Sequence, residues 1–355
     1  MRILLTADPM IPVPPAGYGG IERIVDALAG ELRRRGHAVG LVAKTGSACP
    51  VDAFFPWPGH DVGGKIDTVR NILALRQAVR SFRPDLVHSF SRLAYLSAVL
   101  PSRLPKIMSY QRHVSPAQVR PALRLARRGT LAFTGCSEFI CAQGRTAESD
   151  WTAIPNFVDV ARIDFQPQVP ADAPLLFLSR VESIKGPDTA IAIARRSGRR
   201  LLIAGNRPTA GAEADFFERA IAPHLGRDGI EWIGEVGDVE KNRLLGQCAA
   251  LVVPIRWDEP FGIVFAEALA AGTPVLSCAR GALAEIVRPG VTGFFVYDAD
   301  DGAAAVARLA SLDRHACRTD AERHFNLPVC MDRYLALYAD VIAGRPHRLQ
   351  PAPFT

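Results

Sequence analysis

The chain has 355 residues, of which 48% are hydrophobic and 8% aromatic, and this composition excludes a disordered chain and a membrane-embedded one. No apolar run approaches the ~18 to 20 residues that span a bilayer, and the run after Met1 ends at Asp8. We therefore expect a first strand, no signal peptide and a cytoplasmic protein. Seven cysteines without a C-x-x-C pair indicate neither a disulfide framework nor a zinc site.

The formal net charge of +6 is unevenly distributed. Residues 1–165 carry 21 Lys+Arg against 13 Asp+Glu, whereas the rest of the chain carries 21 against 23. Three arginines at 33–35 suit the C-terminus of a helix that ends before Gly36. A second cluster fits a solvated helix face and an anionic acceptor or membrane surface equally well. Its members are Arg120, Arg124, Arg127 and Arg128. Nucleic acid is disfavoured as a partner, because stacking aromatics are not interleaved with these basic residues.

Along the first half of the chain, short apolar runs alternate with helical patterns, which predicts a parallel sheet with crossover connections. We expect strands at residues 3–7, 39–43, 85–89, 106–110 and 131–136. We expect helices at 21–35 and 67–82, and a short one that begins at Pro121.

A second unit of the same kind opens after the proline-rich segment 166–174. Its expected strands are 175–178, 201–204, 230–233, 250–253, 275–277 and 294–297, with helices between them. A last helical pattern at 328–342 lies past this second sheet. We therefore divide the chain into a first domain at 1–165, a second domain at 166–327 and a C-terminal segment at 328–355, with the linker near 160–174.

The first strand is followed by a long loop that ends in Gly17-Tyr18-Gly19-Gly20 before the first helix. The G-x-G-x-x-G spacing is absent, and the second strand is followed by Lys44 instead of an acidic residue that could bind a ribose diol. A nicotinamide oxidoreductase is therefore disfavoured. Adjacent glycines at a helix N-terminus still let the backbone approach a phosphate, although a plain turn is the commoner explanation of such a pair.

Two basic residues follow the first strand of the second unit, Arg180 and Lys185 in Arg180-Val181-Glu182-Ser183-Ile184-Lys185-Gly186. An arginine fork and a lysine point charge at one strand end could both reach a diphosphate. Taken alone, such residues are more often surface charges.

Two histidines follow strands of the first unit. His113 follows the fourth strand and His88 lies at the end of the third. A hydrogen-bonded loop residue is the commoner role for an isolated histidine in such a place. The alternative for His88 is a position on the acceptor side.

The segment from Trp257 to Glu267 combines two carboxylates, Glu259 and Glu267, with a glycine turn and the start of a helix. Pro260 favours the first turn, and Gly262 lets a ligand approach the free amides of the helix N-terminus, which attract a diphosphate. The carboxylates can accept hydrogen bonds from sugar and ribose diols on either side of that diphosphate. An ordinary amphipathic helix explains the apolar residues of the segment but gives Glu259 no role.

Asp298-Ala299-Asp300 has the D-x-D form that holds a divalent metal in some enzymes. It directly precedes an expected helix, so capping of the helix N-terminus explains it better. We expect no metal site and no cofactor.

Three segments together resemble the retaining nucleotide-sugar glycosyltransferases of family 4, which have the GT-B fold. They are the P-x-G-Y-G-G-I-E-R-x-V loop, the R-x4-K pair and the E-x7-E segment. The resemblance spans almost the whole chain. It implies two Rossmann-like α/β domains with parallel sheets that face each other across a cleft, and a C-terminal helix that crosses back to the first domain. It departs from the family pattern at Phe157 and at Arg280-Gly281, where glycines are frequent.

The resemblance also implies roles for individual residues. Glu259 would bind the donor sugar, Glu267 the ribose, and His113 would act near the transferred sugar and the departing phosphate. The diphosphate would be held by the remaining donor-site residues, namely Gly19, Gly20, Arg180, Lys185 and the amides of Phe261, Gly262 and Ile263.

We thus expect a hexosyltransferase that uses a nucleotide diphosphate sugar without a metal. Its acceptor would be lipid-linked or anionic, in bacterial-type glycan or glycolipid synthesis, with peripheral contact at the inner face of the membrane. A sugar-nucleotide epimerase of the same fold and a non-catalytic nucleotide-sugar-binding subunit are the alternatives. The base, the sugar and the acceptor are left open, because they depend on loop geometry.

Overall fold

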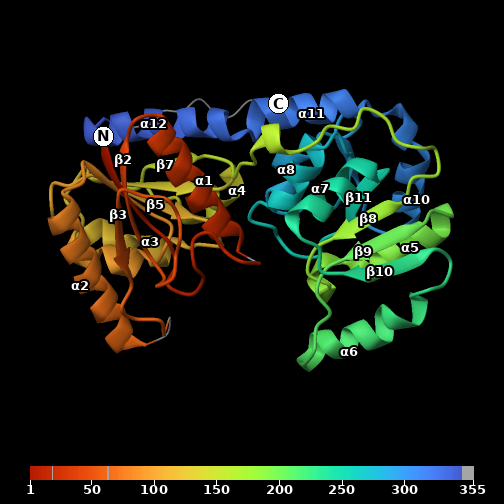
Figure 1. Ribbon diagram of the computed structural model, residues 1–355, viewed down its shortest axis with the longest axis horizontal. Helices are drawn as coiled ribbons and strands as arrows, with labels where there is room; N and C mark the ends of the chain where they lie inside the picture. The colour runs from red at the N-terminus through yellow and green to blue at the C-terminus, as the bar shows by residue number, and fades with distance from the viewer. Residues whose placement is uncertain (18, 62–63, 346–355) are drawn as a thin grey trace. The chain divides into compact units, whose positions relative to one another are not determined.

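The computed structural model describes residues 1–17, 19–61 and 64–345, which form two compact α/β units (Figure 1). The first unit comprises Met1–Asn156 together with the segment that begins at Leu327, and the second comprises Phe157–Asn326. Tyr18 of the glycine loop and residues 346–355 of the expected C-terminal segment lie outside the described residues.

The first unit is built on a seven-stranded parallel sheet with strand order β3-β2-β1-β4-β5-β6-β7. The central strands carry continuous apolar runs, because helices cover both faces of such a sheet and bury side chains of either orientation. The strands are β1 (Arg2–Thr6), β2 (Ala38–Ala43), β3 (Ala53–Pro56), β4 (Leu86–Ser89), β5 (Lys106–Tyr110), β6 (Leu131–Gly135) and β7 (Trp151–Ala153).

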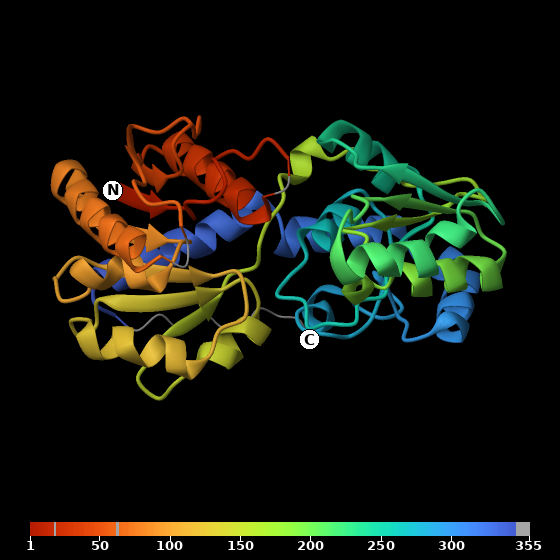
Figure 2. The same ribbon diagram turned by 90° about the horizontal axis from the view of Figure 1, so that it is seen from below.

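Five α-helices and a 3₁₀ turn connect or cover these strands in the described part of the unit. They are α1 (Gly20–Arg34), α2 (Lys65–Phe82), η1 (Leu93–Ala98), α3 (Pro116–Leu125), α4 (Glu138–Gly144) and α12 (Leu327–Ile342). Figure 2 shows α2, in orange, along one side of the unit. A capping box formed by Ser115 and Gln118 begins α3, which therefore starts before Pro121 and contains that proline within it.

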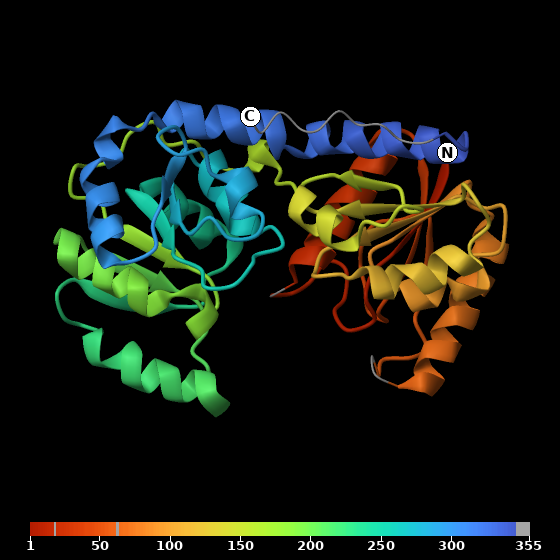
Figure 3. The ribbon, with the colours of Figure 1, turned by 180° about the vertical axis from the view of Figure 1, so that it is seen from behind.

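The C-terminal helix α12 packs against α1 of the first unit (Figure 3), which is the return that the resemblance predicts. Arg35 at the end of α1 donates to the carbonyl of Pro328 at 3.1 Å and pairs with Asp332. His88 Nδ1 lies 2.7 Å from the hydroxyl of Tyr338, and His88 Nε2 lies 2.6 Å from Ser109 Oγ. His88 is fully buried and burial lowers its pKa to about 3, so it is a neutral core residue that ties α12 to the sheet. The acceptor-side alternative for His88 is therefore wrong.

The second unit has a six-stranded parallel sheet with strand order β10-β9-β8-β11-β12-β13. Its strands are β8 (Leu175–Leu178), β9 (Leu201–Ala204), β10 (Ile230–Gly234), β11 (Ala250–Val253), β12 (Val275–Ser277) and β13 (Gly293–Phe295). Its α-helices are α5 (Pro187–Ser197), α6 (Gly211–Ala220), α7 (Asp238–Gln247), α8 (Ile263–Ala270), α9 (Leu283–Ile286), α10 (Ala299–Ala307) and α11 (Arg314–His324).

Two strands of the first unit, β3 and β7, are not among those expected from the sequence. Both lie at the outer edges of the seven-stranded sheet and are only three or four residues long. β3 alternates half-buried and exposed residues and ends in Pro56, which is typical of an edge strand and gives no continuous apolar run. None of the described helices is both long and apolar enough to cross a membrane.

Candidate functional site

The candidate site of the second unit lies where neighbouring strands β8 and β11 end. Parallel strands present their carboxyl ends at one edge of the sheet, and ligands of open α/β sheets bind at that edge. The segment after β8 forms a 3₁₀ turn at Ser183–Lys185, and the segment after β11 leads to α8. Both segments of the proposed donor site therefore meet at one edge.

Lys185 and Glu259 form an ion pair between these two segments. Lys185 Nζ lies 2.5 Å from Glu259 Oε2, and the two side chains are only 11% and 10% exposed. The indole N–H of Trp257 donates to the same oxygen at 2.9 Å, and Lys185 Nζ lies 4.7 Å from the centre of the Trp257 ring. Each buried charge is thus compensated, which the low-polarity surroundings require. Trp257 is a contact residue that the sequence analysis did not assign to the site.

Glu267, in the second turn of α8, forms a second carboxylate–lysine pair. Its Oε1 lies 2.5 Å from Nζ of Lys241 on α7, and Lys241 also lies 3.0 Å from Asp238 Oδ1. Burial opposes the charged form of Lys241, but Glu267 and Asp238 outweigh it and raise the pKa of the ammonium group. Lys241 is a second residue that the sequence analysis missed, because nothing in the local pattern of α7 distinguishes it from a surface lysine.

Arg180 follows β8 and pairs with Glu182, and its side chain is 41% exposed. The turn that carries these residues is anchored from α6, because Glu213 accepts hydrogen bonds from both the backbone N–H and the hydroxyl of Ser183 at 2.7 Å. The guanidinium group is thus positioned at the same edge as Lys185 while it remains accessible to an anion.

The glycine turn before α8 has the conformation that the sequence requires. Gly262 has φ +80°, and a Cβ on it would lie 2.6 Å from ring atoms of Phe265. Phe261 is buried against Phe325, with ring centres 5.7 Å apart, and Ile263 begins the helix. The first amides of α8 are therefore held in place at the strand edge.

Gly281 fixes the backbone of Glu259 from the loop after β12. It has φ +58°, and a Cβ there would lie 2.3 Å from the carbonyl oxygen and 2.5 Å from the nitrogen of Glu259. The N–H of Ala282 donates to the same carbonyl at 2.8 Å. The segment Arg280-Gly281, where the family often has two glycines, thus retains the one glycine on which Glu259 packs.

The remaining predicted residues belong to the first unit. Gly19 is the N-cap of α1 and Gly20 its first residue. His113 follows β5, is exposed, and has Nδ1 3.1 Å from Gln143 Oε1 and its ring edge-on to Phe139.

Near the start of α1, two acidic residues that the sequence analysis did not single out are buried, Asp8 and Glu22. Arg112 lies 3.5 Å from Asp8 Oδ2. Burial raises the pKa of Glu22 against the hydrogen bond from its own N–H, and the Asp8 charge adds to the rise.

The D-x-D segment caps a helix, as expected. Asp298 Oδ1 accepts hydrogen bonds from the N–H groups of Asp300 and Asp301 at 2.9 Å each, at the start of α10. Across the described ranges, no three His, Cys, Asp or Glu side chains are grouped closely enough to hold a metal ion.

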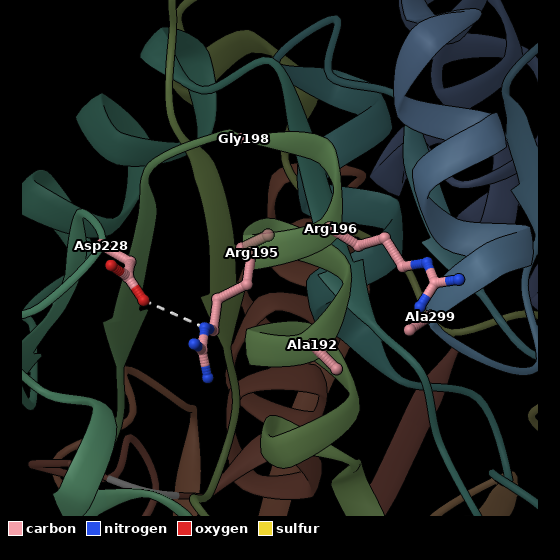
Figure 4. Close-up of a pocket in the computed structure, with 7 residues that line it drawn as sticks. Ala192, Arg195, Arg196, Gly198, Asp228 and Ala299 are labelled. Carbon is pink, nitrogen blue, oxygen red and sulfur yellow. Dashed lines mark ion pairs between the residues drawn. The ribbon is translucent and has the colours of Figure 1, made fainter.

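Figure 4 shows a surface pocket of the second unit, which is lined by residues of α5 together with Gly198, Asp228 and Ala299. It is next to the C-terminal end of α5, whereas Lys185 of the candidate site directly precedes the N-terminal end of that helix. Arg195 pairs with Asp228 at 3.0 Å, and Arg196 pairs with Asp300. Both arginines of the pocket are thus engaged by carboxylates, and the pocket does not belong to the candidate site.

Two family models match the two halves of the chain. Residues 161–323 match the family described as glycosyl transferases group 1, and residues 18–162 match glycosyltransferase family 4. A glycogen synthase of Mycobacterium tuberculosis is 34% identical over 368 aligned positions, which cover 88% of this chain and 86% of that protein. A D-inositol 3-phosphate glycosyltransferase of Nocardioides sp. is 36% identical over 163 positions, which cover 41% of this chain and 36% of that protein.

Solved structures agree over nearly the full length. AviGT4, a glycosyltransferase involved in avilamycin A biosynthesis, is 26% identical with a TM-score of 0.71, and the match covers 97% of this chain and 98% of that one. Anabaena Alr3699/HepE, solved in complex with UDP, is 20% identical with a TM-score of 0.70 and covers 96% and 100% of the two chains. At that lower identity the second likeness shows the fold alone.

Proposed function

The chain belongs to the group 1 and family 4 glycosyltransferases with the GT-B fold, and from this premise we propose that it moves a sugar from a nucleotide diphosphate sugar to an acceptor hydroxyl with retention of configuration. The observation that carries the proposal is the pair of glutamates around the start of α8, each held by a lysine. Two carboxylates that can accept hydrogen bonds from sugar and ribose hydroxyls thus flank the amides and cations that can bind the diphosphate between them.

In this proposal Glu259 binds hydroxyls of the donor sugar and Glu267 binds the ribose. Arg180, Lys185 and the amides of Phe261, Gly262 and Ile263 stabilise the charge that grows on the diphosphate as the glycosidic bond breaks. In the first unit, Gly19 and Gly20 let the backbone approach the phosphates, and His113 acts near the transferred sugar and the departing phosphate.

We propose retention because the family resemblance implies it, and the contacts of Glu259 are compatible with a step that has no enzymic nucleophile. Glu259 is compensated by Lys185 and Trp257 and is thereby a positioned acceptor instead of a free nucleophile. The acceptor hydroxyl would attack from the side of the departing diphosphate, and the diphosphate would accept the hydroxyl proton. The cationic groups at the strand edge supply the charge that a metal supplies in other glycosyltransferases, so we propose that no metal is needed.

The donor class and the metal independence can be tested together by melting the protein with UDP-, GDP- and ADP-sugars, with and without EDTA. A donor at about 100 times its Kd should stabilise the folded chain by about 2.7 kcal/mol. We expect one base to raise the melting temperature most, by the same amount in EDTA, and transfer to an acceptor to survive EDTA. If none of the sugar nucleotides raises the melting temperature, or if manganese must be added back for binding and transfer, the proposal is wrong.

Analysis of the products formed from the same donors, with and without an acceptor, separates the alternatives. An epimerase converts the donor to a new sugar nucleotide when no acceptor is added, whereas a transferase leaves it intact or hydrolyses it slowly. A non-catalytic binding subunit raises the melting temperature with the donor but releases no nucleoside diphosphate with any acceptor. Release that depends on acceptor identifies the transferase.

For the acceptor side, we propose a lipid-linked or anionic acceptor reached through peripheral contact with an anionic membrane at the cytoplasmic face. The four arginines of the basic cluster, 120, 124, 127 and 128, are all exposed on and after α3. On α2 of the same unit, three apolar side chains are also exposed on the face opposite the core, Ile66 at 71%, Val69 at 55% and Leu73 at 56%. Exposed arginines follow them on the same face, at positions 76 and 80. This combination suits an interfacial helix at an anionic surface.

Sedimentation with liposomes tests this contact. Each arginine near an anionic surface contributes about 1 kcal/mol, and the contribution falls with salt. The wild type should therefore sediment with anionic and not with neutral liposomes at low salt. A variant with the four cluster arginines changed to Gln should not sediment, and I66S/V69S/L73S should bind more weakly.

A control with an equal charge change, in which Arg195, Arg196, Arg207 and Arg243 of the second unit become Gln, should bind like the wild type. Failure of the wild type to bind at low salt would indicate a soluble acceptor and a purely solvated role for the basic cluster.

A further inference from the structure

Lys241 is the one cation of α7 that contacts the proposed ribose-binding glutamate. Among the described residues, the side-chain contact of Glu267 is its Oε1 bonded to Lys241 Nζ at 2.5 Å, and both side chains are less than one-fifth exposed. A second carboxylate, Asp238, lies 3.0 Å from the same ammonium group and restrains it from the first turn of α7. The lysine is thus fixed from two sides, and Glu267 is fixed through it.

This arrangement divides the two oxygens of Glu267. Oε1 is taken by the ammonium group, whereas Oε2 has no hydrogen bond within the described part of the chain. As a carboxylate oxygen, Oε2 is a hydrogen-bond acceptor, and a ribose hydroxyl would donate to it. A carboxylate repels a diphosphate that binds beside it. The positive charge of Lys241 offsets the negative charge of Glu267 and so removes that repulsion.

We propose that Lys241 is a positioning residue for nucleotide recognition, which holds Glu267 so that its second oxygen reads the ribose hydroxyls. This inference rests on the proposed function and adds to it a residue that selects ribonucleotides over deoxyribonucleotides. The packing of α7 does not require the lysine, because Leu244 and Leu245 are buried from the same helix and supply its apolar contact.

The test is calorimetric binding of the nucleoside diphosphate that the melting screen selects, and of its 2′-deoxy and 3′-deoxy analogues, to the wild type and to Lys241→Met. A hydrogen bond to a charged group predicts that the wild type binds at least one deoxy analogue about 10-fold more weakly or worse. In Lys241→Met the ribonucleotide should weaken about 10-fold, and the preference over the analogue should fall to within about threefold. With the donor, KM should rise and kcat should change little, since the ribose contact is the same in the ground state and the transition state.

Matched variants keep the result interpretable. Arg243→Met removes an exposed cation two residues along α7 that pairs with Glu240, and it should leave the ribose preference unchanged. Lys241→Arg should retain the preference, and it carries the test if Lys241→Met does not fold. In a Glu267→Gln background, Lys241→Met should add no further loss, because the two residues act as one unit.

Two failures are distinguishable. A wild type that binds no nucleoside diphosphate overturns the proposed function. A wild type that discriminates the ribose while Lys241→Met discriminates it equally overturns the role of Lys241 and leaves the donor site standing.

Discussion

Lys185→Ala should lower kcat and raise the donor KM more than any other single change at the cationic edge of the site. The lysine is nearly buried and pairs with Glu259. Its loss would also remove the charge-assisted contact that we propose it makes with the diphosphate. Such a contact contributes about 1.5 to 3 kcal/mol, which corresponds to roughly 10- to 150-fold in kcat/KM. Arg180→Ala should act in the same direction but less strongly, because its side chain is 41% exposed and already shared with Glu182.

The same change should also destabilise the protein. Without Lys185, the Glu259 carboxylate is left in an environment where its side chain is 10% exposed, and a broken buried pair costs about 3 to 5 kcal/mol. The double variant Lys185→Ala/Glu259→Gln removes the orphaned charge and should recover much of the melting temperature but none of the activity. Initial-rate kinetics and thermal unfolding of the three proteins measure both effects. A wild-type kcat in Lys185→Ala would mean that the lysine binds only the ground state or does not contact the donor.

The sequence predicted the central strands well, because parallel strands are continuous apolar runs. It also placed the expected donor-site residues after strands, whose carboxyl ends share one edge of the sheet. Lys185 and Glu259 are 74 residues apart, yet both follow strands that pair in the sheet. The two residues can therefore be assigned to one donor site from sheet topology alone. The ion pair between them depends on side-chain rotamers, which the sequence pattern does not predict.

The contacts of Lys241 and the burial of His88 could not be predicted from the sequence pattern, for two different reasons. Lys241 lies on a helix, and a helical lysine among acidic neighbours looks like a solvated charge until the packing of α7 against α8 is known. His88 ends a strand, as a site residue would, but α12 returns from the far end of the sequence and covers it. Long-range contacts of this kind decide whether a polar residue at a strand end meets a ligand or the core.

The two glutamates should separate by what they bind. Glu267→Ala should weaken binding of the donor and of the free nucleoside diphosphate alike, by roughly 10-fold or more, because its proposed partner is the ribose that both ligands carry. Glu259→Ala should leave nucleoside diphosphate affinity within about threefold of the wild type and lower kcat instead, since its proposed partner is the transferred sugar. Removal of Glu259 also frees Lys185 from its internal partner at 2.5 Å. Lys185 then stays available to the diphosphate, so affinity for the diphosphate should not fall through loss of a cation.

Calorimetry with the free nucleotide and initial rates with the donor sugar together measure this division. Glu267→Gln and Glu259→Gln serve as isosteric controls, which keep the packing while they remove the charge from each lysine pair. In the Gln variants, Lys241 and Lys185 face neutral amides. We therefore expect Glu267→Gln to weaken nucleotide binding and Glu259→Gln to lower kcat, as in the Ala variants. Equal losses of nucleotide affinity in Glu259→Ala and Glu267→Ala would contradict the assignment, because both carboxylates would then contact the nucleotide and neither would be reserved for the sugar.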